Sequence, residues 1–145
     1  MTFSAGGARF FLVLPALFVV GCAHHRPASK PVAAQITGSV SYLQRMALPP
    51  DAAIEVIFSD VSVQDTPAIQ LGNQVIPAAG KQAPFPFAIR YDSRQIVSSH
   101  TYDVQARIKV GERVIFTSDT ANLVLTQGRP SSVEIIVKPV PVPKP

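Results

Sequence analysis

The chain has 145 residues, of which 13 are lysine or arginine and 9 are aspartate or glutamate, and its net charge is +4. This length suits a single domain. Because the basic residues are scattered and form no cluster, the composition argues against a nucleic-acid partner, and a single cysteine excludes an internal disulfide.

An apolar run from Phe10 to Val20 stands near the start of the chain. A membrane-spanning helix needs about 20 apolar residues, and this run is much shorter. Arg9 precedes the run, small Gly21 follows it, and no acidic residue occurs before Asp51. These features predict a secretory signal peptide over residues 1–21.

The only cysteine, Cys22, directly follows this segment. The stretch "VVGC", which ends at Cys22, resembles the lipobox of bacterial lipoproteins. The resemblance implies that the signal is cut before Cys22, which then carries acyl chains; the alternative is an ordinary signal peptide with an unrelated thiol. Two or more acyl chains hold a protein stably on a membrane without crossing it. Ala23 stands where enterobacterial lipoproteins of the inner membrane have aspartate, which implies an outer-membrane anchor with the domain facing the periplasm.

Flexible segments are expected on both sides of the domain. Residues 22–34 comprise the lipidated cysteine and a linker that has prolines and no hydrophobic periodicity. His24 and His25 lie in this linker, where no third ligand converges on them, so we expect no metal and no other cofactor. In residues 139–145 proline recurs at every second position, which favours a polyproline II tail that is either a docking peptide or a frayed end.

Between these segments, residues 35–138 alternate apolar and polar side chains. The clearest case is His100 to Val110, which predicts a half-buried antiparallel strand. Gly111 and Glu112 then predict a two-residue hairpin turn. In chain order, the residues expected to face the core are Ile36, Val40, Tyr42, Ile54, Val56, Phe58, Ile69, Leu71, Val75, Phe85, Phe87, Ile89, Tyr91, Tyr102, Val104, Ala106, Ile108, Val110, Val114, Phe116, Val133, Ile135 and Val137.

The spacing of these segments predicts the fold class. Turn residues separate them, and no window favours a helix beyond one turn at Asp92 to Ile96, where Asp92 would cap. About seven such strands predict a single antiparallel β-sandwich. Pro84 and Pro86 interrupt one strand, and both remove an N–H donor from the same side of it. That segment should therefore be an edge strand.

Three isoleucines fall out of phase, on strand faces that are otherwise polar: Ile57, Ile115 and Ile136. Single exposed apolar residues are common, so each could stand alone or lie under a loop. If at least two lie side by side, they form an apolar strip suited to docking a partner's helix or strand. We take the three as the candidate partner-binding residues.

The titratable residues of the domain argue against catalysis. His100 begins a strand, where a hydrogen-bonded structural role is expected rather than that of a general base. Asp60, Asp65 and Asp92 stand at turns, where carboxylates commonly accept hydrogen bonds from local backbone N–H groups. No serine lies in a nucleophile-elbow motif and no spacing of His and carboxylates suggests a metal, so we expect no enzymatic activity.

Four segments resemble the YbaY-type lipoproteins, a family that also takes in the YscW lipoprotein chaperone, or pilotin, of type III secretion. They are "MALPPDAAIEVIFSDVSVQDTPA" (46–68), "GKQAPFPFAIRYD" (80–92), "HTYDVQARIKVGERVIFTSDT" (100–120) and "VLTQG" (124–128). The similarity covers nearly all of residues 35–138. It implies a β-sandwich lipoprotein of the periplasm.

Two functions are compatible with these observations. The first is a non-catalytic, pilotin- or chaperone-like module that binds another envelope protein, acting as a monomer anchored through Cys22. The second is an accessory role in envelope glycan binding or glycan metabolism. The second would need exposed aromatic rings, whereas the chain has no tryptophan and Tyr42, Tyr91 and Tyr102 all fall in core-facing phase. The sequence therefore favours the first.

Overall fold

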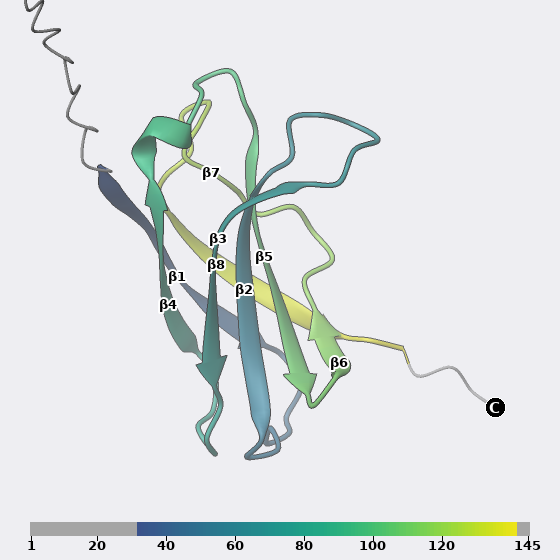
Figure 1. Ribbon diagram of the computed structural model, residues 1–145. Helices are drawn as coiled ribbons and strands as arrows, with labels where there is room; N and C mark the ends of the chain where they lie inside the picture. Colours follow the sequence, from purple (N-terminus) through teal and green to yellow (C-terminus); the bar gives the residue numbers. More distant parts are fainter. Residues whose placement is uncertain (1–31, 142–145) are drawn as a thin grey trace, which may run out of the picture.

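The computed structural model describes residues 32–141 (Figure 1), and this part of the chain is all β. Cys22, His24 and His25 lie outside the described residues. The strands are β1 (Ala33–Tyr42), β2 (Ala52–Asp60), β3 (Ile69–Pro77), β4 (Phe85–Asp92), β5 (Tyr102–Val110), β6 (Arg113–Thr117), β7 (Leu123–Val124) and β8 (Ser132–Pro139). Within residues 32–141 the only helical segment is the 3-10 turn η1 (Ser93–Gln95).

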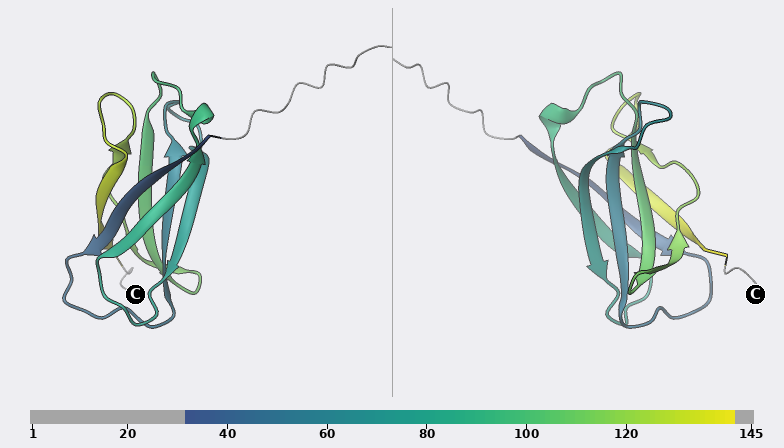
Figure 2. Two further views of the ribbon diagram at one scale, coloured as in Figure 1. Left: turned by 90° about the vertical axis from the view of Figure 1, so that its left-hand side faces the viewer. Right: turned by 45° about the vertical axis from the view of Figure 1, so that its right-hand side comes forward.

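The strands form one sheet of eight, in the order β3-β2-β5-β6-β8-β1-β4, with β7 paired to β5. The all-β prediction is confirmed, but the sheet curls into a nearly closed barrel and is not clearly two separate layers (Figure 2). The expectation of purely antiparallel pairing is wrong, because β1 and β8 run parallel. Alternation of side chains is the same in both pairings, so the sequence pattern does not distinguish them.

The barrel closes where the two end strands, β3 and β4, approach each other. The Gln74 side-chain carbonyl accepts a hydrogen bond from the Ala88 N–H at 2.7 Å. Gly72 permits the approach, since a Cβ there would lie 2.7 Å from Ile89 Cγ2. Within the described sheet, β4 pairs only with β1, so the edge strand predicted from Pro84 and Pro86 is confirmed. Ala88, two residues after Pro86, directs its N–H to the same edge and gives it to Gln74.

The core lies inside the curled sheet and follows the predicted alternation on most strands. Phe58 of β2 is fully buried, with its ring centroid 5.2 Å from that of Tyr91 and 5.8 Å from that of Tyr102. The buried apolar residues are Ile36, Val40, Leu48, Ala52, Ile54, Val56, Phe58, Ala78, Phe85, Phe87, Ile89, Tyr102, Val104, Ala106, Ile108, Phe116, Val124, Ile135 and Val137.

On β3 the predicted phase is wrong for Val75, which was expected in the core but is 56% exposed. Of the other two residues expected there, Leu71 is half-buried against the core, and Ile69, the first residue of the strand, is 64% exposed. The register with β2 shifts at this point, since Phe58 pairs with Gly72 and Ser59 with Gln70, which leaves Leu71 as an extra residue. Such a bulge moves the residues beyond it to the other face of the strand. As a result Gln74 lies inward and reaches β4.

The two ends of the barrel are formed by different segments of the chain. Val32, the first described residue, lies beside η1, where the Ser93 N–H donates to its carbonyl at 3.0 Å. The loop after β1 and the hairpin between β5 and β6 lie at the opposite end (Figure 1). That hairpin turns through Gly111 and Glu112 as predicted, with a positive φ of 59° at Gly111, the position that favours glycine in a type II′ turn.

Candidate functional site

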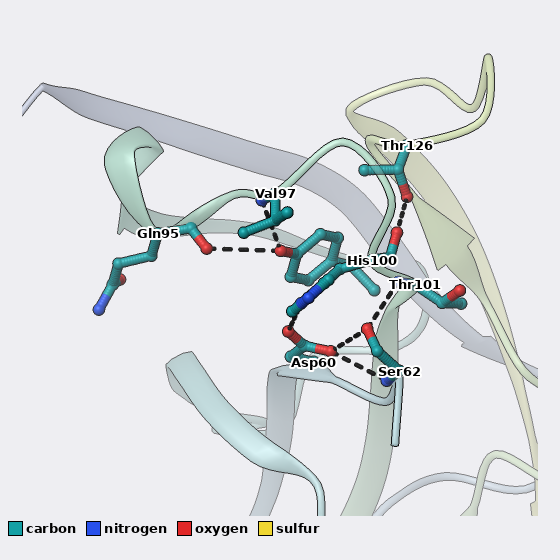
Figure 3. A network of polar contacts seen from close by, with 8 residues as sticks. Asp60, Ser62, Gln95, Val97, His100, Thr101 and Thr126 are labelled. Carbon is teal, nitrogen blue, oxygen red and sulfur yellow. Dashed lines mark hydrogen bonds and ion pairs between the residues drawn. The ribbon is translucent and has the colours of Figure 1, made fainter. Parts of the chain in front are cut away.

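A polar network joins the loops at the end of the barrel where the chain enters (Figure 3). Asp60, the last residue of β2, accepts hydrogen bonds from the Ser62 hydroxyl and from the Ser62 N–H at 2.9 Å. His100 Nδ1 lies 2.6 Å from the other Asp60 oxygen. The Thr101 N–H donates to Ser62 Oγ at 2.9 Å, and the Thr126 hydroxyl donates to the His100 carbonyl at 2.7 Å.

The network contains Ser, His and Asp but lacks the connections of a catalytic triad. In a triad the histidine lies between the two others and takes the proton of the serine. Here Asp60 lies between, and the Ser62 hydroxyl donates to it rather than to His100. The hydrogen-bonded structural role predicted for His100 is therefore what the geometry provides, and the contacts of the network tie the β2–β3, β4–β5 and β7–β8 loops together.

The carboxylates of this region accept hydrogen bonds from nearby N–H and O–H groups. Burial raises the pKa of Asp60, but the hydrogen bonds from Ser62 and His100 outweigh it and leave that pKa below its usual value. Asp92 caps η1 as predicted, accepting the Arg94 N–H at 3.0 Å. Asp103, which the alternation placed on the polar face, is only 4% exposed. Its carboxylate accepts hydrogen bonds from the Asn122 N–H and the Gln105 side-chain amide, which compensate its burial.

An apolar groove lies at the opposite end of the barrel. Its volume is about 450 Å³, within the range of ligand-binding clefts. Short strand β6 and the chain leaving β8 both contribute to its lining. The lining residues, which define what we call the β6 groove, are Met46, Pro49, Val110, Arg113, Val114, Ile115, Phe116, Pro139, Val140 and Pro141.

A bulge in β6 lies within this groove. Ile108 pairs with Phe116 and Lys109 with Val114, so Ile115 is an extra residue with no partner on β5. Its carbonyl instead accepts the Val140 N–H at 2.9 Å, which fixes the chain beyond β8 along the side of the groove. The residues 139–141, which the sequence assigned to a tail, therefore line a concave surface, and no local pattern identified them.

The three candidate isoleucines do not come together. Ile57, half-buried on β2, pairs with Asn73 and Gln105 and lines a separate small hollow. Ile136 is 47% exposed on β8, where it pairs with Ser41. Ile115 alone lies in the β6 groove. Of the three candidates predicted from the sequence, only Ile115 lines the β6 groove, and the sequence did not predict the groove itself.

Two further classes of feature are missing from residues 32–141. No helix in this range is both long and apolar enough to cross a membrane. No three His, Cys, Asp or Glu side chains in it are grouped so that they could hold a metal ion. Of the three tyrosines, Tyr102 is fully buried and Tyr42 and Tyr91 are half-buried.

Comparisons with known proteins bear on this barrel directly. A solved structure of an alternative pilotin from the type II secretion system of Vibrio cholerae is similar, with a TM-score of 0.73 and 39% identity over 76% of this chain and 99% of that one. The uncharacterized lipoprotein YbaY of Escherichia coli K12 is 33% identical over 93 residues. That match covers 64% of this chain and spans about half (49%) of YbaY. The model of the type III secretion system lipoprotein chaperone family, YscW, matches residues 31–137, and the chain therefore belongs to that family.

Proposed function

We propose that this protein is a non-catalytic, pilotin-like lipoprotein that binds a segment of another envelope protein in the β6 groove. It is anchored to the outer membrane through Cys22, faces the periplasm and acts as a monomer. Membership of the lipoprotein chaperone family and the similarity to a type II secretion pilotin support this role. The main observation that supports the proposal is the β6 groove. It is a large apolar hollow at one end of a barrel whose core is already filled.

The backbone of the groove indicates what kind of segment it accepts. Pro49, Pro139 and Pro141 have no N–H, and the Val140 N–H is already bonded to the Ile115 carbonyl. An extended peptide that adds to a sheet edge needs backbone N–H donors as well as acceptors, and these four residues supply no free donor. A helix satisfies its own backbone groups and needs only an apolar surface. We therefore expect the apolar face of an amphipathic helix as the bound segment.

The position of the groove suits such a role. Val32 lies at the η1 end, and the tether from Cys22 joins the domain there, whereas the groove opens at the opposite end. A partner bound at that end does not compete with the attachment point for the same surface. Of the three candidate isoleucines, this assigns partner binding to Ile115; Ile57 and Ile136 lie outside the groove.

Site-specific photo-crosslinking in the protein's own envelope tests the proposal. Met46 lines the groove and is 48% exposed; Val75, 56% exposed on β3, is a matched control on another face. A photo-reactive residue at position 46, but not at position 75, should yield one dominant adduct, and mass spectrometry should map it to an amphipathic segment of an envelope protein. Equal labelling from both positions, or no adduct from position 46, would contradict the proposal.

A further inference from the structure

We propose that Arg113 makes the β6 groove selective for an apolar segment that carries a carboxylate beside its apolar face; this inference rests on the function proposed above. Arg113 is the first residue of β6 and lies directly after the hairpin turn, exposed to solvent. It is the only charged residue among those that line the groove. An apolar segment bound there must therefore lie against a single positive charge.

Arg113 forms no ion pair with an acidic group of the described residues. The ion pairs in that range join Arg94 to Asp92, His100 to Asp60, Arg107 and Lys109 to Glu55, and Lys138 to Asp119. Arg113 takes part in none of these. Arg90 on β4 also has no ion pair in this range and does not line the groove, whereas Arg45, next to Met46, lines an adjoining hollow rather than the groove itself. The guanidinium at its rim is thus available to a partner's carboxylate.

The chemistry of the guanidinium determines the expected partner. Arginine binds a carboxylate through two parallel hydrogen bonds, and it lies more readily beside apolar surface than lysine does because it is more weakly hydrated. On a helix, a residue that flanks the stripe at i, i+3, i+4 and i+7 sits at the edge of the buried face. A glutamate or aspartate there would reach Arg113 while the stripe fills the groove.

The expected size of the preference for an acidic segment depends on the solvent exposure of Arg113 at the rim of the groove. A solvent-exposed ion pair contributes little, and a well-aligned bidentate pair contributes more, so we expect about a three- to tenfold preference for the acidic segment. The preference should weaken with added salt, since charges at the rim of an interface are screened. The apolar contacts should be insensitive to salt over the same range.

The test uses the mature lipidated protein in detergent and three fluorescent, C-terminally amidated peptides. Each peptide is an amphipathic helix with the same leucine stripe, and they differ only in one flanking residue, which is Glu, Gln or Lys. Amidation removes the terminal carboxylate as a competing partner. Binding is measured by fluorescence anisotropy for wild type, Arg113→Gln, Arg113→Glu and the control Arg90→Gln. Circular dichroism first establishes that each variant is folded.

The expected result is a preference of wild type and Arg90→Gln for the Glu peptide over the Gln peptide. That preference should disappear in Arg113→Gln, and Arg113→Glu should instead prefer the Lys peptide. Equal affinity of the Glu and Gln peptides for wild type would overturn the role of Arg113 and leave the proposed function standing. Failure of every peptide to bind, together with no adduct from position 46, would overturn both. Tighter binding of dodecanoate than of any peptide would overturn the inference in favour of a fatty-acid ligand.

Discussion

Replacing Gly38 with alanine would test the parallel pairing of β1 and β8, which no sequence pattern indicated. Gly38 pairs with Val133 of β8 and with Phe87 of β4. An added methyl group would overlap the Val133 carbonyl oxygen and would lie 2.7 Å from Phe87 Cζ. The ring can shift, but the carbonyl belongs to the backbone of the β1–β8 ladder, and β1 is also paired with β4 on its other side. The strands must therefore separate around Gly38.

The cost can be estimated from these contacts. Overpacking of a core position typically costs about 1–3 kcal/mol. Separation of the strands also weakens neighbouring ladder bonds, such as the one from the Thr37 N–H to the Ser131 carbonyl at 3.0 Å, at about 0.5–1.5 kcal/mol each. We expect Gly38→Ala to lower the free energy of unfolding by about 2–5 kcal/mol, a large part of the total stability of a domain.

Urea denaturation followed by circular dichroism provides the measurement. Ser39→Ala is the matched control, because Ser39 is the next residue along β1 and already carries a Cβ, so the change adds no atom there. Phe87→Leu in the Gly38→Ala background should recover only part of the loss, since it relieves the ring contact but not the carbonyl contact. A loss below about 1 kcal/mol for Gly38→Ala would refute the close parallel approach of β1 and β8.

Three further predictions concern the anchor, the loop network and the core. Cys22→Ser should leave uncut precursor that takes up no labelled palmitate, while wild type partitions with outer membrane; wild-type protein recovered in the soluble periplasmic fraction would contradict the anchor. Because Asp60 has a lowered pKa in the folded protein, its contribution to stability is present above its unfolded pKa of about 3.9 and is lost as the pH falls through the lower folded value. Asp60→Asn should therefore flatten the loss of stability below pH 4 in urea titrations, and an unchanged slope would exclude this role. Tyr102→Ala should cost about 3–5 kcal/mol of unfolding free energy, since Tyr102 is fully buried, and a loss under 1 kcal/mol would show that the ring is not part of the core.

Several structural features could be predicted from the sequence alone, because they depend on residues that are close together in the chain. Alternation with period two places Val104, Ala106 and Ile108 on one face of β5, and all three are buried. Pro84 and Pro86 indicated an edge strand because they cannot donate hydrogen bonds in any sheet. The Asp92 cap and the hairpin turn at Gly111 likewise depend on residues that are neighbours in the chain. Each of these features requires only the residue types and their spacing.

The tertiary structure decided how strands meet and where their registers slip. Two single-residue bulges lie at Leu71 and Ile115; the first turned Val75 of β3 outward, and the second lies in the β6 groove. The burial of Asp103 depends on Asn122, which lies far from it in sequence. The physical reason is the same in each case: alternation repeats every two residues in every strand, so it carries no information about the neighbouring strand. A slip of one residue depends on how one strand packs and pairs with its neighbour, which the alternation within either strand does not record.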